Sequence, residues 1–334
     1  MSGVGETVQN PHLFIRPIIR REALLSSRIE GTVCSLSDVF SFEASHGRDP
    51  SDDVREVINY VSAMELGIKL LKDLPISLRF VNEVHKELMT GVRGQANRPG
   101  YLRLEQVWLG SPSTSIGEAR FVPPPPDRLR DLFADWEKFA NEPLDMPPLV
   151  KCALMHYQIE AIHPYEDGNG RIGRLMIVLF LIASGMLSVP LLYLSAYFER
   201  DRQRYYDELL NVSATGDWER WLRYFLTGVL QQSEDVLARM RGLRDIQEGH
   251  RRTIQGGRGS SSALRLLDEF FANPFMTVRG ASLVLDMSLA GARRVLNRLV
   301  EAGLLRVDDS AWPPLYVADD VLKALRGTNS GSDL

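Results

Sequence analysis

The 334-residue chain has only two cysteines, Cys34 and Cys152, and no C-x-x-C pair. Disulfide scaffolds and thiolate zinc sites need more cysteines at closer spacing, so neither organises this protein. Free thiols suit a reducing compartment. The first ten residues also lack a basic segment followed by an apolar one, so we expect no secretory signal. These absences predict a cytoplasmic protein.

The chain also lacks an excess of positive charge. It carries 39 Lys and Arg residues against 43 Asp and Glu residues, a formal net charge of −4. This balance argues against a chain that binds nucleic acid over much of its surface. Hydrophobic residues at 44% and charged residues at 25% are typical of a soluble globular protein. The length allows two domains and a large core, and no internal repeat is evident.

No apolar run is long enough to cross a membrane as one helix. Residues 175–194 are uncharged over twenty positions, which is the length of a span. However, Gly185 and Ser188 interrupt the run, and Pro190 cannot continue a helix. The continuous helix is therefore expected from Leu175 to Ser188. Its length suits the buried central helix of a globular bundle, and we expect no membrane partner.

Apolar residues at three-and-four spacing predict four further helices, over residues 52–74, 77–89, 127–141 and 149–163. The predicted fold class is mainly α, a helical bundle with one β-hairpin and a small C-terminal module. Gly and Ser residues cluster between 241 and 262, so we expect a linker there. The predicted parts are residues 1–90, 91–240, the linker 241–262, and residues 263–326.

Residues 163–174 read H-P-Y-E-D-G-N-G-R-I-G-R and lead directly into the apolar run. The glycine-rich turn at a helix N-terminus presents free N–H groups that attract anions. Arg171 and Arg174 share one face of the first turn, and guanidinium groups suit phosphate oxygens. Asp167 is a hard ligand for the Mg²⁺ that accompanies polyphosphates. His163 can accept a proton near neutral pH.

Each element alone has an ordinary explanation. His-Pro is common in loops, G-N-G is a frequent turn, and two arginines often form a solvated helix face. Six roles packed into twelve residues, in an order that forms one anion pocket, favour a nucleotide triphosphate site. The string resembles the signature of the Fic family (filamentation induced by cAMP), H-P-F-x-(D/E)-G-N-G-R-x-x-R. It departs from that signature only at Tyr165, which replaces one aromatic ring by another.

Members of the Fic family mostly transfer AMP from ATP to a hydroxyl group on a protein. The resemblance implies that His163 is the general base and Asp167 the Mg²⁺ ligand. It also implies that Arg171 holds the β-phosphate and that Arg174 reaches the γ-phosphate. The other residues expected to bind ATP are Gly168, Asn169, Gly170, Ile172, Gly173 and Tyr206. ATP and Mg²⁺ are the expected co-substrate and cofactor.

A second motif lies far upstream, where residues 26–31 read S-S-R-I-E-G. The string is similar to the family's inhibitory motif, (S/T)-x-x-x-E-(G/N), which assigns Ser26 and Glu30 to it. In the family this glutamate pairs with the second arginine of the signature, here Arg174. The resemblance thus implies that ATP is held unproductively in the resting protein. Without the signature, Glu30 would be taken for a surface glutamate at a helix end.

Residues 98–126 are similar to the family's flap, a hairpin that covers the active site. Residues 107–109 and 120–122 are predicted as short strands, and four prolines from Pro123 end the second. An exposed edge there could pair with an extended target segment. The Y-Y pair at 205–206 resembles one that approaches the nucleotide base in related chains. Of the two, we favour Tyr206, although aromatic residues at helical spacing are more often core.

Residues 263–326 resemble a winged helix: helices at 263–272, 277–286 and 289–302 precede strands at 304–307 and 315–317. Arg293, Arg294, Asn297 and Arg298 lie on the helix that would enter DNA. The module nevertheless has eight basic and eight acidic residues, and DNA binding draws on an excess of cations. Dimerisation or substrate docking is therefore as well supported as DNA binding.

Two classes of function follow from these patterns. The first is a protein adenylyltransferase inhibited by its own Glu30, with a hydroxyl-bearing protein or the chain itself as target. The second is a nucleotide-sensing regulator that binds DNA through its C-terminal module. Within the enzyme class, relatives transfer other phosphate-containing groups. The intact G-N-G-R turn with both arginines favours AMP transfer.

Overall fold

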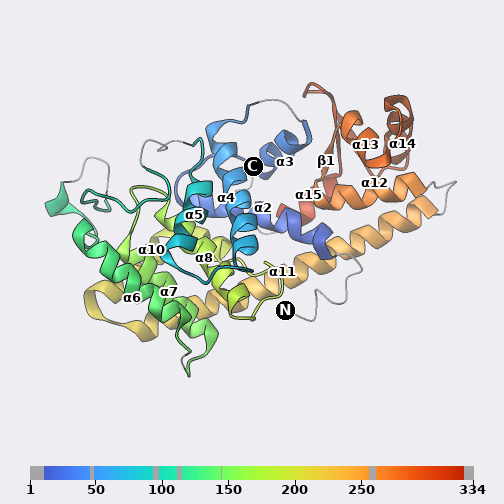
Figure 1. Cartoon of the computed structure of the whole chain (residues 1–334). Coiled ribbons are helices and arrows are strands. Elements are labelled where there is room, and N and C mark those ends of the chain that lie inside the picture. The colour runs from blue at the N-terminus through green and yellow to red at the C-terminus, as the bar shows by residue number, and fades with distance from the viewer. Residues whose placement is uncertain are drawn as a thin grey trace.

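The computed structural model of the chain describes residues 11–45, 49–92, 98–110, 115–143, 145–255 and 261–326. Helices dominate these residues, and the strands form one small antiparallel sheet, so the predicted mainly α class is confirmed (Figure 1). None of the described helices has both the length and the apolarity that a membrane span requires.

The helical bundle occupies the first two thirds of the chain. The predicted helices at 52–74, 77–89, 127–141 and 149–163 are all present, with ends shifted by a few residues. The bundle helices are α2 (Pro11–Ile29), α3 (Leu36–Ser45), α4 (Asp52–Leu70), α5 (Leu78–Leu88), α6 (Leu129–Asn141), α7 (Pro148–Ile162), α8 (Asn169–Ala183), α9 (Ser195–Arg200) and α10 (Arg202–Thr215). Short 3-10 helices, η1 (Ile116–Glu118) and η2 (Pro126–Arg128), lie between α5 and α6.

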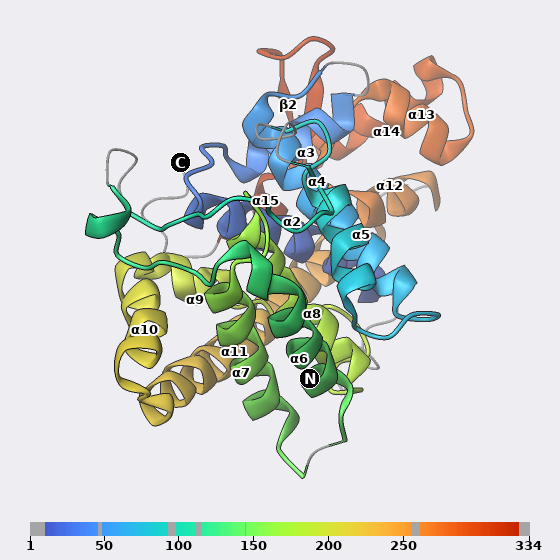
Figure 2. The same cartoon turned by 60° about the vertical axis from the view of Figure 1, so that its left-hand side comes forward.

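Helix α8 is the central element of the bundle. It packs against α7, α4, α5 and α2, and Figure 2 shows α6, α7 and α8 side by side. Every residue from 171 to 181 is buried, as the uncharged run predicts. The helix ends at Ala183, earlier than the predicted Ser188. Gly185 adopts φ 72° and its neighbour Leu187 donates back to the Leu181 carbonyl, which closes the helix before Pro190.

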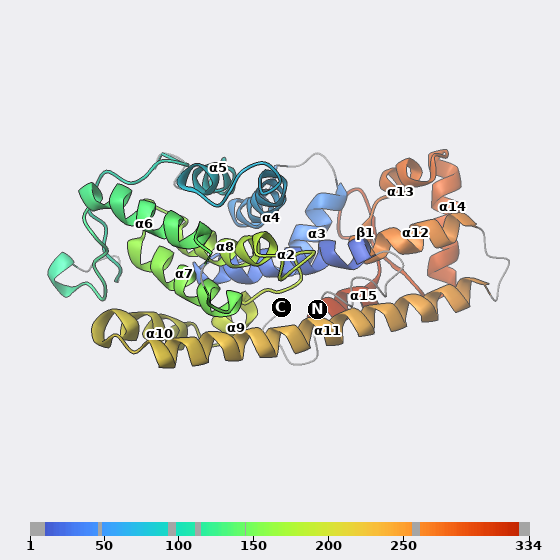
Figure 3. The same ribbon diagram turned by 60° about the horizontal axis from the view of Figure 1, so that its bottom comes forward.

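The predicted linker at 241–262 is wrong over its first fifteen residues. Helix α11 (Trp218–Gln255) is one continuous helix of 38 residues, and it runs along the molecule from α10 to the C-terminal helices (Figure 3). Leu243, His250 and Ile254 are buried at helical spacing, and α11 packs against α12 and α15. This packing outweighs the low helix propensity of the glycines. Residues 256–260 lie outside the described residues.

The C-terminal residues form helices and a three-stranded sheet in the predicted order, with β1 and α15 added. The elements are α12 (Ser261–Ala272), β1 (Phe275–Met276), α13 (Val278–Leu285), α14 (Leu289–Glu301), β2 (Arg306–Asp308), β3 (Leu315–Val317) and α15 (Asp319–Arg326). The sheet order is β1-β3-β2, with Phe275 opposite Val317 and Val307 opposite Tyr316.

The C-terminal elements share a core with the N-terminal helices. Phe271 of α12 makes an edge contact with Phe14 of α2 at 5.7 Å between ring centroids. Asn273 donates to the Phe40 carbonyl at 3.2 Å, and α12 packs along α2. The helix whose end carries Glu30 is therefore anchored on the C-terminal part of the chain.

Candidate active site

The loop between α7 and α8 carries residues 163–168 of the predicted signature. His163 caps the end of α7 in the left-handed region, at φ 51° and ψ 61°. Gly168, at φ 78°, is the N-cap of α8. A left-handed histidine is strained, so the surrounding contacts must hold it. The sharp loop leaves the free N–H groups of the first turn of α8 beside His163.

Contacts within the loop fix its shape. The side chain of Asn169 accepts from the Tyr165 amide at 2.9 Å and donates to the Tyr165 carbonyl at 2.8 Å. Asn169 therefore holds the loop with its side chain, and only its backbone is left for a phosphate. The Tyr165 ring stacks on His85 of α5 at 3.7 Å between centroids. His85 Nδ1 accepts from the Gly100 amide, so its Nε2 donates to the Asp167 carbonyl, at 2.9 Å.

Arg103 joins the loop of residues 163–168 to the segment predicted as the flap. Its guanidinium donates to the carbonyls of His163 at 2.9 Å, Glu105 at 2.9 Å and Pro124. Its amide donates to the Pro164 carbonyl at 3.0 Å. The side chain is 1% exposed. One buried residue thus holds both ends of the flap against the strained histidine.

The predicted strands of the flap are reduced to a single bridge. Leu109 pairs with Phe121 in antiparallel fashion, and the Leu109 amide donates to the Phe121 carbonyl at 2.8 Å. Gln106 occupies the next position with its side chain, which donates to the carbonyls of Val107 and Pro123 at 2.9 Å. Here the Gln106 side chain makes the hydrogen bonds that backbone groups would make in a β-ladder. No continuous strand therefore forms over 107–109 or 120–122. The hairpin tip, residues 111–114, lies outside the described residues.

Glu30 and Ser26 both contact Arg174. Arg174 Nη2 donates to Glu30 Oε1 at 2.6 Å, and Arg174 Nε donates to Ser26 Oγ at 2.9 Å. Burial alone would raise the pKa of Glu30, but the charge and hydrogen bond of Arg174, with help from Arg171, lower it. Glu30 is therefore ionised at neutral pH, and Arg174 Nη1 keeps no hydrogen-bond partner among the described residues.

Arg171, three residues before Arg174 in α8, is also buried. Its Nη1 is 3.4 Å from Glu56 Oε2 of α4, and its Nη2 is 3.5 Å from Asp167 Oδ1. Within the described part of the chain, Nε and Nη1 make no hydrogen bond. Buried donors without acceptors are costly, which makes an anionic ligand the natural complement of this guanidinium group.

Asp167 is the residue best placed to hold a metal ion. Its side chain is 44% exposed, and Oδ1 accepts from the Gly168 amide at 2.6 Å. No cluster of three or more His, Cys, Asp or Glu residues suited to a metal occurs among the described residues. One accessible carboxylate fits Mg²⁺, which is commonly bound by one or two carboxylates, waters and substrate phosphates.

Some of the residues described above border a cavity of about 540 Å³. His163, Gly170, Arg174 and Glu30 line one side of it, and Leu109 and Phe121 of the flap line another. Tyr206 lines the cavity and donates to the Ile29 carbonyl at 3.4 Å. Tyr205 instead is fully buried, with its hydroxyl 2.9 Å from His156 Nε2. Of the two tyrosines, Tyr206 is the one that borders the cavity, and its contact with a nucleotide base stays a prediction.

Six signature residues with a predicted binding role do not line this cavity, among them Asp167, Gly168, Asn169, Arg171 and Ile172. Ile172 is 0% exposed and belongs to the hydrophobic core, so its side chain is not available to a nucleotide. Gly173 lies outside the lining too; a β-carbon there would come within 2.3 Å of Glu160 Oε1. A β-carbon on Gly170 would come within 2.1 Å of Glu30 Oε1, so the Glu30 side chain would have to move away.

Two ionisable residues in the cavity wall, His163 and Glu160, have pKa values shifted by burial. Burial lowers the pKa of His163 to about 4, so the imidazole is neutral at pH 7. Burial raises the pKa of Glu160, on α7, to about 8. Glu160 is then mostly protonated at neutral pH and adds little negative charge to the wall. A neutral imidazole can accept a proton, and a protonated Glu160 does not add to the negative charge that Glu30 brings to the wall.

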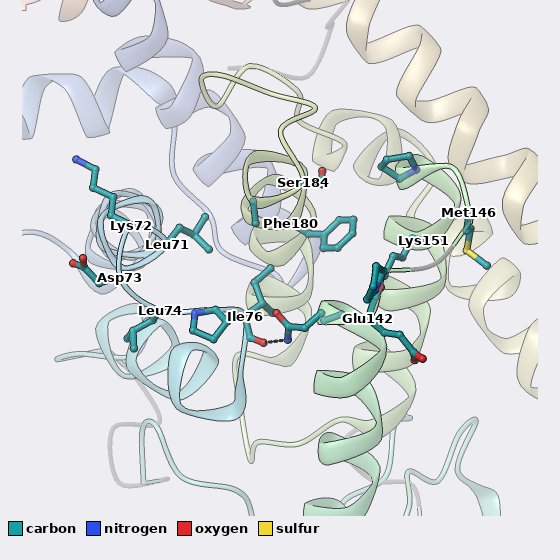
Figure 4. Close-up of a pocket in the computed structure, with 16 residues that line it drawn as sticks. Leu71, Lys72, Asp73, Leu74, Ile76, Glu142, Met146, Lys151, Phe180 and Ser184 are labelled. Atoms are coloured by element: carbon teal, nitrogen blue, oxygen red, sulfur yellow. Dashed lines mark hydrogen bonds between the residues drawn. The ribbon is translucent and has the colours of Figure 1, made fainter.

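A second cavity, of about 560 Å³, lies away from the predicted site residues (Figure 4). It is bordered by the α4–α5 turn and the ends of α6, α7 and α8. Lys151 lies in its wall and donates to the Glu142 carbonyl at 2.7 Å. None of the predicted nucleotide-binding residues lines it.

Two family models match the chain: Fic/DOC family N-terminal over residues 1–69, and Fic/DOC family over residues 75–181. The chain belongs to the Fic/DOC family. It is 28% identical over 233 residues to protein adenylyltransferase fic-1 of Caenorhabditis briggsae, across 66% of this chain and 41% of that protein. Protein adenylyltransferase Fic of Nematostella vectensis is 28% identical over 210 residues, across 60% and 44%. The chain thus spans about two fifths of these relatives.

Solved structures of Fic proteins have the same fold. A Fic family protein from Desulfovibrio desulfuricans G20 superposes with a TM-score of 0.60 at 20% identity, over 95% of this chain and 90% of that one. Fic-1 from Caenorhabditis elegans gives a TM-score of 0.55 at 22% identity, over 71% and 68%. At this identity the likeness establishes the fold and nothing finer.

The sequence analysis did not identify four residues at the site of this Fic chain: Glu56, His85, Arg103 and Glu160. Each acts through contacts with segments remote in sequence or through its burial. Glu160 had a local signal, because it lies one helical turn before His163. Arg103 lay inside the flap string but could not be told from a surface arginine without its three carbonyl partners.

Proposed function

We propose that this Fic protein is an adenylyltransferase that transfers AMP from ATP to a Ser, Thr or Tyr hydroxyl of a protein. The observation that carries the proposal is a neutral His163 in the same twelve-residue segment as two buried arginines, each with at least one donor nitrogen that has no acceptor among the described residues. The curated relatives, which are named protein adenylyltransferases, support it further.

The proposed chemistry begins at His163. Its imidazole takes the proton from the target hydroxyl as the oxygen attacks the α-phosphorus of ATP. The bond between the α-phosphorus and the bridging oxygen breaks, and pyrophosphate leaves. Little covalent chemistry is needed from the protein, so positioning and charge neutralisation supply most of the acceleration.

The phosphates are the proposed ligands of the α8 N-terminus. The backbone amides from Gly168 to Gly170 face the α- and β-phosphates, Arg171 holds the β-phosphate and Arg174 the γ-phosphate. Asp167 would hold Mg²⁺, which when bound neutralises phosphate charge and orients the chain of phosphates. Tyr206 contacts the base from the cavity wall.

Glu30 is the proposed inhibitor of the resting enzyme. It occupies a donor of Arg174 that the γ-phosphate needs, at a charge-assisted distance of 2.6 Å. Because Glu30 stays ionised, it also places a negative charge where the triphosphate must lie. ATP can enter, but its α-phosphorus is misplaced for attack.

The target protein is proposed to bind along the flap. Leu109 and Phe121 line the cavity and form one antiparallel bridge, beside which an extended segment of the target would add as a further strand. Such a segment would bring a hydroxyl to His163. The same route allows the chain to modify itself.

Labelling with two forms of ATP tests the transferred group. The Glu30→Gly protein is incubated with Mg²⁺, a cell lysate and either α-labelled or γ-labelled ATP, with His163→Ala added as the control. The proposal predicts that every protein band that depends on His163 is labelled from the α-position and not from the γ-position. Bands labelled from the γ-position that disappear with the control variant would indicate phosphate transfer by this protein and would contradict AMP transfer.

A further inference from the structure

The outer face of α13 and α14 carries an unpaired arginine cluster: Arg279, Arg293, Arg294 and Arg298. All four side chains are exposed. Within the described part of the chain, none of them takes part in an ion pair. Exposed arginines elsewhere commonly do, as Arg220 with Glu208 and Arg306 with Asp319 show. The cluster therefore keeps its full positive charge.

Four of the eight acidic residues of the same module lie close to cations outside the cluster. Asp268 pairs with Arg251 of α11 at 2.8 Å, and Asp320 lies 3.6 Å from His250 of α11. Asp308 and Asp319 both contact Arg306 at the base of the β2–β3 hairpin. The other four acids of the module, Glu269, Asp286, Glu301 and Asp309, are in none of these pairs. Within the described residues, none of the eight acids forms an ion pair with the arginine cluster, whose side chains are exposed.

Helix α14 is held firmly and projects from the end of the molecule. Its buried side packs on α13 and α12 through Ala292, Leu296 and Leu299. On the other side, Asn297 Oδ1 accepts from the hydroxyl of Tyr316 in β3 at 2.9 Å. Figure 3 shows α13 and α14 at the opposite end of the molecule from α6, α7 and α10. Nothing in the described catalytic part covers the arginines.

We propose that this face binds duplex DNA, with α14 in the major groove. An α-helix fits that groove, and arginines recognise both phosphates and guanine edges. Leu289, at the start of α14, is 57% exposed beside the arginines and suits contact with a thymine methyl group. The site is independent of the proposed AMP transfer, because no residue of it lies in the nucleotide cavity.

The test measures the salt dependence of binding by the full chain. A fluorescent 20-base-pair duplex is titrated between 50 and 200 mM salt, with anisotropy as the readout. The variant Arg294→Ala/Arg298→Ala removes two arginines from the face. The matched control, Arg241→Ala/Arg252→Ala, removes two exposed arginines of α11 that form no ion pair with the described residues. Thermal unfolding checks that both variants fold.

The proposal predicts roughly tenfold weaker binding by the α14 variant at low salt and a salt slope smaller by about two. The control should bind within about twofold of the unaltered chain. The proposal is overturned if the duplex does not bind at 50 mM salt, or if both variants lose affinity equally. Tighter binding of an RNA duplex than of the DNA duplex would also contradict it.

Discussion

Replacing Glu30 with glycine is expected to raise AMP transfer onto protein about 10- to 100-fold. The substitution removes a charge-assisted hydrogen bond to Arg174, worth about 1.5–3 kcal/mol. Arg174 is then free for the γ-phosphate, and the negative charge opposite the triphosphate is gone. Initial rates of self-modification with labelled ATP measure the effect.

Replacing Arg174 provides the control for this prediction. In the Glu30→Gly background, Arg174→Ala should weaken productive use of ATP, because the freed guanidinium is the group that gains the phosphate. Glu30→Gln keeps the side-chain shape and removes only the charge, so it should also raise the rate. An unchanged rate in both Glu30 variants, with ATP binding intact, would remove the inhibition proposal.

Replacing His163 with alanine is expected to lower transfer by about 100- to 10,000-fold, the range typical of a lost general base. ATP binding should persist, since the phosphates are assigned to the arginines and amides of α8. The rate is measured in the Glu30→Gly background, where activity is high. Comparable transfer by His163→Ala would contradict the role of the imidazole.

The pH dependence of the transfer rate is a second test of the role of His163. Burial lowers the pKa of His163 from an ordinary 6.5 to about 4. The base is the neutral form, which exists above the pKa and is lost as the pH falls through it. Transfer limited by this group should therefore persist from pH 7 to pH 5. A fall in rate centred near pH 6.5 would show that His163 is not buried as described.

The features of residues 163–174 could be interpreted from the sequence because they lie next to one another in the chain. A turn, two arginines three residues apart and a following apolar run are all contained in residues 163–174. The predicted central helix is present for the same reason, although Gly185 ends it earlier than Pro190 would. Local pattern does not show which glycine takes a left-handed conformation, so the end of the helix was misplaced.

Other features depend on contacts between remote segments. Arg103 meets carbonyls at 105, 124 and 163, and no sequence spacing reveals such a set. Residues 241–255 contain two glycines and were expected to be a linker, yet packing on α12 and α15 keeps them helical. The approach of Glu30 to Arg174 came from the family resemblance, because 144 residues separate the two in the chain.

Calorimetric titration of ATP with Mg²⁺ into the Glu30→Gly protein tests most directly whether residues 163–174 form a triphosphate site. We expect one binding event per chain, with affinity that falls when Arg171 or Arg174 is replaced by alanine. The absence of any heat of binding, under conditions where the protein is folded, would contradict the site and the activity proposed for it.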